Sequence, residues 1–213
     1  MKYIIIFLFA ISLNSCALVS SIYEPYIQKE IAEYDLAKTD TLVDIGCGNG
    51  LFDLKIAKYH PDLFLILEDI KSNYAYKNIP KKVASNFNRL NIKNKKKQYE
   101  FILGQKDSIP LPSNKYDKIL SRITLHECEH KEKIIDEYYR ILKPNGKLII
   151  VELEPKFDGE KDRACKFKYL SKKDILFYFD KFKDFKLYKE SFIMYPNNQN
   201  GYDKINILMF QKV

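Results

Sequence analysis

A glycine-rich stretch is the part of this sequence best suited to binding a small molecule. Asp44, Gly46, Gly48 and Gly50 form the pattern Asp-x-Gly-x-Gly-x-Gly, directly after a compact apolar run at 41–45. Glycines allow a sharp turn and let a ligand approach the backbone without a side chain in the way. The free N–H groups of a following helix attract an anionic group. We therefore predict a ligand site here rather than a tight turn alone.

Two common nucleotide-binding patterns are absent from this stretch. The dinucleotide fingerprint Gly-x-Gly-x-x-Gly fails, because Leu51 stands where its last glycine is required. The phosphate-binding loop requires Gly-Lys-Ser/Thr, which is also missing. A nucleotide-dependent enzyme such as a dehydrogenase is therefore disfavoured.

An acidic pair follows the second apolar run, 63–67. Asp69 stands nineteen residues after Gly50. An ionised carboxylate at this place can accept hydrogen bonds from both hydroxyls of a ribose. Glu68 is the neighbouring candidate, and its simpler interpretation is a surface charge.

Titratable side chains also follow the predicted strand at 116–120. His126, Glu127 or His130 could deprotonate an oxygen or nitrogen acceptor, since histidine titrates near neutral pH. The simpler interpretation is that a histidine here packs in the core or starts a helix. We name His126 and Glu127 as the catalytic candidates.

Strands and helices must alternate to position these groups. Continuous apolar strands between helices predict a doubly wound α/β fold with a mainly parallel sheet covered on both faces. A closing hairpin would place one antiparallel strand in this seven-stranded sheet. Ser171 with Asp174 predicts a helix cap. The predicted strands are 41–45, 63–67, 99–103, 116–120, 147–153, 185–195 and 204–211, and the predicted helices are 24–36, 51–59, 74–91 with a break at Pro80, 129–142 and 171–179.

The order of these features resembles class I S-adenosylmethionine (SAM)-dependent methyltransferases over residues 24–213. The resemblance implies a Rossmann-like methyltransferase fold with SAM as cofactor. It implies that the glycines contact the methionyl end, that Asp69 holds the ribose, and that the segment after the third strand flanks the adenine. Two departures from the family pattern are Gln105, where many relatives carry Asp, and Asn145, which replaces a common glycine. The cofactor-binding residues predicted on this basis are Asp44, Gly46, Cys47, Gly48, Gly50, Asp69, Ile70, Gln105 and Lys106.

The resemblance also implies methyl transfer, in which the protein chiefly binds, orients and excludes water. No Asn-Pro-Pro-Tyr type tetrad follows the fourth strand, so methylation of amino groups on DNA bases or glutamine is not supported. Only 155–170 separates the fifth strand from its helix, so we expect no large cap. The acceptor is therefore expected to be a small molecule, lipid-like or quinone-like.

Composition indicates one folded domain and a basic surface. The chain has 213 residues and a formal net charge of +8, with one local lysine run at 93–97. No basic helix or aromatic-basic strip stands out, so we expect a solvated surface and no nucleic-acid partner. The spacing of the cysteines matches no zinc pattern, and we predict no metal site, although a single disulfide stays open. The oligomeric state is left open. The four cysteines are Cys16, Cys47, Cys128 and Cys165.

The N-terminus carries a hydrophobic segment at 1–16. Its apolar run of about ten residues is too short for a typical spanning helix and suits a signal peptide. The sequence Leu13-Asn14-Ser15-Cys16 resembles the bacterial lipoprotein signal, in which the cysteine is lipidated. An uncleaved membrane anchor and a helix belonging to the domain are the alternatives.

We predict membrane association through this segment or through a lipidated Cys16, with the side of the membrane open, and a methyltransferase domain at 17–213. Because SAM is a cytoplasmic metabolite, an exported chain also suggests an alternative function. That alternative is a non-catalytic or cofactor-only binding protein on the same fold.

Overall fold

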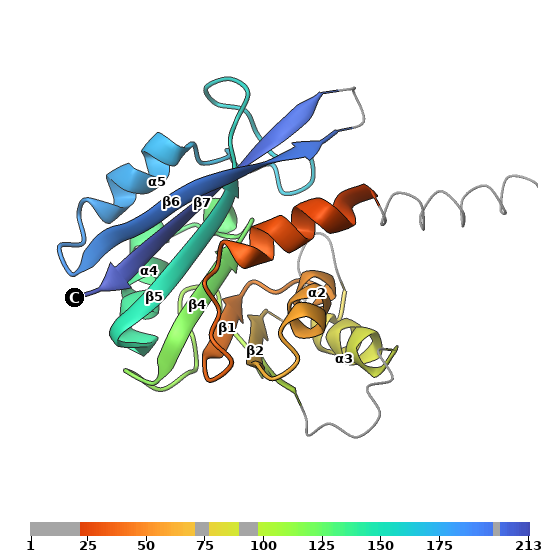
Figure 1. The fold of residues 1–213 in the computed structure, drawn as a ribbon. Coiled ribbons are helices and arrows are strands. Elements are labelled where there is room, and N and C mark those ends of the chain that lie inside the picture. The colour runs from red at the N-terminus through yellow and green to blue at the C-terminus, as the bar shows by residue number, and fades with distance from the viewer. Residues whose placement is uncertain (1–21, 71–76, 90–97, 198–200) are drawn as a thin grey trace, which may run out of the picture.

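A computed structural model describes residues 22–70, 77–89, 98–197 and 201–213 of the chain. The predicted leader 1–16 with Cys16, and the lysine run 93–97, lie outside the described residues. The described part forms one seven-stranded sheet in the order β3-β2-β1-β4-β5-β7-β6, with helices on both faces (Figure 1).

The sheet has the predicted mixture of directions. Strands β1 to β5 pair in parallel, and β7 is antiparallel to both β5 and β6. Chain order reverses at β1, which lies between β2 and β4, so the carboxyl ends of these strands form the crevice where such folds bind ligands. The predicted fold class is confirmed. The strands are β1 (Thr41–Ile45), β2 (Phe64–Asp69), β3 (Tyr99–Leu103), β4 (Tyr116–Arg122), β5 (Leu142–Leu153), β6 (Phe185–Pro196) and β7 (Tyr202–Lys212).

The helices lie on the two faces of the sheet. The N-terminal helix at 22–32, α2 and α3 cover one face, and α4 and α5 cover the other (Figure 1). Successive strand residues therefore enter different layers: Leu42 packs in the core under α2, and Val43 packs in the core under α4. The remaining elements are α2 (Leu51–Tyr59), α3 (Ile79–Arg89), the 3-10 turn η1 (Leu125–Glu127), α4 (Lys131–Ile141) and α5 (Lys172–Phe179).

Two local predictions were wrong. We predicted that Pro80 breaks a helix, but α3 begins at Ile79, so Pro80 lies in its first turn. There its missing N–H costs no helical hydrogen bond, and its fixed φ suits the helix. The predicted turn around Asn145 does not precede the fifth strand but lies inside β5, as a break in its register with β4. Asn145 takes a left-handed φ of 65°, which asparagine tolerates better than most residues.

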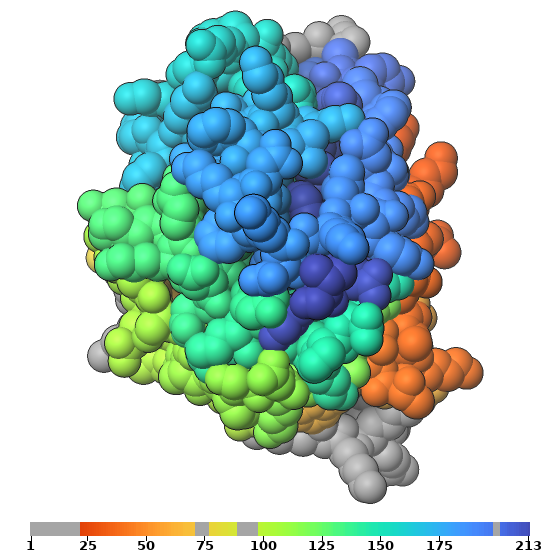
Figure 2. Space-filling model, turned by 90° about the vertical axis from the view of Figure 1, so that its left-hand side faces the viewer, coloured from red at the N-terminus to blue at the C-terminus, as the bar shows by residue number. Residues whose placement is uncertain are grey.

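The segment between β5 and α5 lies at one end of the α4/α5 face. Figure 2 shows it in cyan next to α5, with α4 in green below. None of the helices described is long and apolar enough to cross a membrane. The N-terminal helix is fixed to α2 by Glu24, whose carboxylate contacts Lys55 at 2.5 Å and Lys58 at 2.6 Å.

The predicted cap of α5 is present as a full capping box. The Ser171 hydroxyl accepts the backbone N–H of Asp174 at 3.1 Å, and the Asp174 carboxylate accepts the backbone N–H of Ser171 at 3.0 Å. The box starts a helix that places Ile175 and Phe179 in the core.

We expect Ser171→Ala to lower the free energy of unfolding by about 1 kcal/mol, because one N–H at the helix start loses its acceptor. Urea denaturation would measure the change. Ser171→Thr keeps a hydroxyl and serves as the matched control, which should lose much less. Equal stability of the alanine variant and the wild type would show that the cap does not hold α5.

Candidate functional site

The glycine loop makes a sharp turn at the carboxyl end of β1. Gly46, Gly48 and Gly50 all have left-handed backbones, with φ of 77°, 58° and 72°. The backbone N–H groups of Gly46 and Cys47 both donate to the carbonyl of Glu68, at 2.9 and 3.1 Å. The loop is therefore fastened to the end of β2 before α2 begins.

Gly46 also lacks room for a side chain. A Cβ at this position would lie 2.4 Å from the Thr124 side chain, which approaches from the segment after β4. The Thr124 hydroxyl contacts the Gly46 carbonyl at 3.4 Å. Position 46 requires glycine both for its backbone angle and for this close approach.

A cavity of about 370 Å³ opens beside this loop, at the carboxyl ends of β1, β2 and β4. All the predicted cofactor-binding residues line it except Gly50, which caps α2 instead. Of the two predicted catalytic residues, Glu127 lines the cavity and His126 does not. The lining comprises Asp44, Ile45, Gly46, Cys47, Gly48, Asn49, Phe52, Glu68, Asp69, Ile70, Gln105, Lys106, Arg122, Ile123, Thr124, Glu127, Cys128, Glu129 and Ile134.

Asp69 connects the glycine loop to the end of β2. Its carboxylate accepts the backbone N–H of Gly48 at 2.7 Å and the N–H of Ile70 at 2.7 Å. Burial raises the pKa of Asp69 to about 6, although both N–H groups favour the charged form. The group is ionised at neutral pH and faces the cavity.

Glu68 is not the surface charge that its position suggested. Its side chain is 4% exposed, and burial together with the Asp69 charge raises its pKa to about 8. Its carboxyl occupies the space where a side chain at Gly104 would stand, so the glycine that follows β3 makes room for it.

A second pair of buried acids, Asp44 and Asp53, lies next to the loop. Asp44 and Asp53 are 4% and 0% exposed, and burial raises the pKa of both, that of Asp44 further because of the Asp53 charge. Oδ1 of Asp44 has no hydrogen-bond partner among the described residues. The sequence analysis missed Asp53, whose only signal was an acid in the first turn of α2.

The Arg122 charge partly offsets the effect of burial on the pKa of Asp44 and Asp53. Arg122, at the end of β4, lines the cavity and lies 4.0 Å from the Phe52 ring. Its Nε donates to the buried carboxylate of Glu30 at 2.7 Å, and the hydroxyls of Tyr34 and Tyr195 donate to the same carboxylate at 2.5 Å. Burial alone would raise the pKa of Glu30, but Arg122 keeps it below its usual value.

The predicted adenine-flanking residues lie on the open side of the cavity. Gln105 and Lys106 are exposed, and the Lys106 ammonium pairs with Glu129. The backbone of Gln105 bridges to Ser108, which closes a tight turn after β3.

His126 lies behind the cavity wall rather than in it. Its side chain is 1% exposed, and Nδ1 lies 2.9 Å from Oε2 of the buried Glu152. Burial lowers the pKa of His126, but hydrogen bonding to Glu152 outweighs this and raises it overall. The third candidate, His130, is exposed and contacts Asp107 at 3.1 Å. The three cysteines in the described part of the chain are free thiols.

The sequence matches the family described as "Methyltransferase domain" over residues 43–150. Two relatives are the biotin biosynthesis bifunctional protein BioHC of Saccharophagus degradans, 24% identical over 61% of this chain, and the ubiquinone/menaquinone biosynthesis C-methyltransferase UbiE of Rickettsia prowazekii, 30% identical over 55% of this chain. The chain spans 22% and 46% of the lengths of these proteins.

The fold is similar to that of a SAM-dependent methyltransferase from Aquifex aeolicus. The TM-score is 0.67 at 18% identity, and the match covers 86% of this chain and 88% of the other. At this identity the likeness concerns the fold alone.

The raised pKa of Glu68 predicts a pH-dependent stability. The folded chain binds this proton more tightly than the unfolded chain, so the favourable contribution is complete below about pH 4 and is lost as the pH rises through 8. We expect the free energy of unfolding to fall between pH 6 and 9 by roughly 2–3 kcal/mol more in the wild type than in Glu68→Gln, which cannot titrate. Denaturation series at both pH values measure it.

Glu100→Gln is the matched control, because Glu100 is exposed on β3. This control should keep the wild-type pH dependence. The same pH dependence in Glu68→Gln and wild type would contradict the assignment of a protonated carboxyl beside the cavity.

Proposed function

The chain belongs to the methyltransferase domain family, and from this premise we propose that it transfers a methyl group from SAM to a small-molecule acceptor. The observation that carries the proposal is the cavity beside the glycine loop, where Asp69 presents a carboxylate at the end of β2. Family membership, the strand order and this geometry support this place for the cofactor.

The residues around the cavity fit SAM, which carries positive charge on its sulfonium and ammonium groups. The loop leaves its backbone accessible because its three glycines adopt left-handed angles. The unpartnered Oδ1 of Asp44 at the loop is an acceptor in need of a donor. Asp69 would hold the ribose hydroxyls, and Gln105 with Lys106 would flank the adenine.

Bound SAM supplies an electrophilic methyl group on sulfur. The chain's own contribution is to hold both reactants in line and to keep water out. Glu127 is the acid that reaches the cavity from η1, so it is the candidate to accept a proton from the acceptor. His126 lies next to it, with Nε2 3.9 Å from the Glu127 carboxylate, and would position that carboxylate.

For the acceptor we propose a lipid-like or quinone-like small molecule. The support is the similarity to a ubiquinone/menaquinone biosynthesis C-methyltransferase and the hydrophobic leader, which would bring the chain to a membrane. The alternative function, cofactor binding without turnover, is favoured by the lipoprotein-like signal alone. It predicts bound SAM with no methylated product from any acceptor.

Replacement of Asp69 tests the cofactor site. We expect Asp69→Asn to weaken SAM binding at least tenfold in calorimetry at pH 7.5, since hydrogen bonds to a charged acceptor contribute roughly 1.5–3 kcal/mol. Wild-type affinity should fall as the pH drops below about 6, where Asp69 takes up a proton, and should be close to tenfold weaker at pH 5. The asparagine variant should show no such fall.

Asp136→Asn is the control, because Asp136 is exposed on α4 away from the cavity. It should bind SAM as the wild type does. If Asp69→Asn kept full affinity, the ribose would not be held at the end of β2 and the proposed site would be wrong.

We also propose that Cys16 is lipidated and anchors the chain to a membrane. The support is the sequence Leu13-Asn14-Ser15-Cys16 after an apolar run. Mass spectrometry of the chain expressed in a bacterium should show a mature N-terminus at Cys16 carrying acyl groups, and Cys16→Ser should abolish that product. A chain that still begins at Met1 would mean that the leader is retained.

A further inference from the structure

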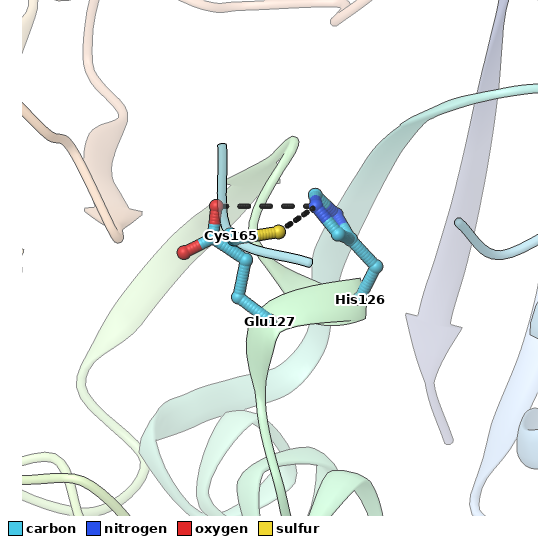
Figure 3. Close-up of side chains that lie close together, drawn as sticks. All are labelled: His126, Glu127 and Cys165. Atoms are coloured by element: carbon cyan, nitrogen blue, oxygen red, sulfur yellow. Dashed lines mark hydrogen bonds and ion pairs between the residues drawn. The ribbon is translucent and has the colours of Figure 1, made fainter. Parts of the chain in front are cut away.

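Three side chains that can bind a metal ion converge behind the cofactor cavity. His126 and Glu127 come from η1, and Cys165 comes from the segment between β5 and α5 (Figure 3). Nε2 of His126 lies 3.6 Å from Sγ of Cys165 and 3.9 Å from Oε1 of Glu127. The three donor atoms all lie within 4.8 Å of one another.

Glu152 fixes the orientation of the histidine ring. One oxygen of this buried carboxylate accepts the backbone N–H of His126 at 3.0 Å, and the other lies 2.9 Å from Nδ1. With its proton on Nδ1 toward Glu152, the ring would direct the lone pair of Nε2 at the sulfur and at Glu127. A carboxylate that orients a histidine in this way is the usual outer partner of a metal-ligating histidine.

The loop around Cys165 holds the sulfur in place. The Asp162 carboxylate accepts the backbone N–H of Cys165 at 2.8 Å and the hydroxyl of Tyr169 at 2.6 Å. The backbone N–H of Phe167 donates to Sγ of Cys165 at 3.4 Å. These contacts fix the position of the sulfur, the atom through which cysteine binds metals.

We propose that His126, Glu127 and Cys165 form a zinc-type site with one open coordination position. Zinc bonds of roughly 2.3 Å to sulfur and 2.0–2.1 Å to nitrogen, at tetrahedral angles, place the two donors about 3.6 Å apart. The observed Nε2–Sγ distance is 3.6 Å. The Glu127 oxygen must approach Nε2 by about half an ångström and must also close on the sulfur, from which it lies within 4.8 Å; Glu127 is only partly buried, which leaves it room to move.

The mixed donor set selects the kind of ion. Nitrogen and thiolate sulfur suit zinc and its neighbours in the first transition series, whereas magnesium and calcium prefer oxygen ligands alone. Three protein ligands with a free fourth position are the arrangement of catalytic rather than structural zinc sites.

The site adjoins the cavity through Glu127, which belongs to both. This step rests on the proposed function: an acceptor hydroxyl or thiol bound at the open position would release its proton to solvent more readily. Its oxygen or sulfur would then bond to the methyl carbon of SAM as the methyl–sulfonium bond breaks and the neutral thioether leaves. The acceptor class that fits is then a hydroxyl or thiol compound small enough to reach η1. Metal binding itself does not depend on methyl transfer.

The probe for the test is Co²⁺, added to the metal-free full chain. We expect one ion to bind per chain, with the intense visible bands of a tetrahedral site and a thiolate-to-cobalt absorption in the near ultraviolet. Zn²⁺ should displace the cobalt and bleach both signals. Absence of a thiolate absorption, or binding without any visible band, would overturn the proposal.

Ligand variants identify the donors. Cys165→Ser should remove the thiolate absorption and weaken Co²⁺ binding by about 100-fold or more, and Glu152→Gln should weaken it by about 10- to 100-fold through the ring orientation. Cys128→Ser is the matched control, because Cys128 is half-buried nearby but outside the cluster, and it should leave the spectrum unchanged. An unchanged spectrum in Cys165→Ser would exclude this cysteine as a ligand.

Two further measurements separate this proposal from its rivals. Cys165→Ser should bind SAM as the wild type does, and Asp69→Asn should bind Co²⁺ as the wild type does, so failure of one site is distinguishable from failure of the other. A Cys165 thiol that reacts quickly with iodoacetamide and is not protected by Zn²⁺ would instead indicate a nucleophilic cysteine paired with His126, and would overturn the metal site.

Discussion

The geometry of the cavity depends on one carboxylate, that of Asp69, which binds the backbone of two strand ends at once. It accepts the N–H of Gly48 from the loop after β1 and the N–H of Ile70 after its own strand, each at 2.7 Å. Three alternating left-handed glycines would otherwise leave this loop with many conformations, since glycine loses the most freedom on ordering. The two hydrogen bonds to the Asp69 carboxylate hold the loop in one of these conformations, and the carboxylate faces the cavity. The ligand site is thus preorganised by the same group that we propose as its ribose acceptor.

The buried carboxyl groups around the cavity favour a cationic ligand, because a nearby positive charge would stabilise their ionised forms. Asp44, Asp53, Glu68 and Asp69 are all nearly buried, and burial raises the pKa of each. Arg122 also lines the cavity, but its charge is paired with a buried acid, Glu30. A dinucleotide would bring a negatively charged diphosphate into this acidic environment, whereas SAM brings positive charge. The electrostatics therefore agree with the missing glycine of the dinucleotide pattern.

The fold and the cofactor loop could be predicted because they follow from local sequence. Continuous apolar runs located β1 and β3 to the residue, and alternating glycines marked the loop. The Ser171–Asp174 cap needs only residues three apart. What escaped prediction joins distant residues: Arg122 meets Glu30 across 92 positions, and His126 meets Cys165 across 39. The hydrophobic periodicity of the sequence gives no indication of contacts between such distant residues. The effect of Pro80 is local, but it depends on where the helix begins. The expected helix began too early in the sequence, which made Pro80 look like a break.

The short turn η1 explains why two adjacent candidates have different surroundings. In a 3-10 turn successive side chains point about a third of a circle apart. Glu127 therefore reaches the cavity while His126 turns inward to Glu152. A histidine in that position has no access to an acceptor, so it can act on one only through a neighbour. Glu127 is such a neighbour, and Cys165 completes the set on the same side of the ring. The burial that keeps His126 out of the cavity is the same feature that would make it a well-oriented ligand.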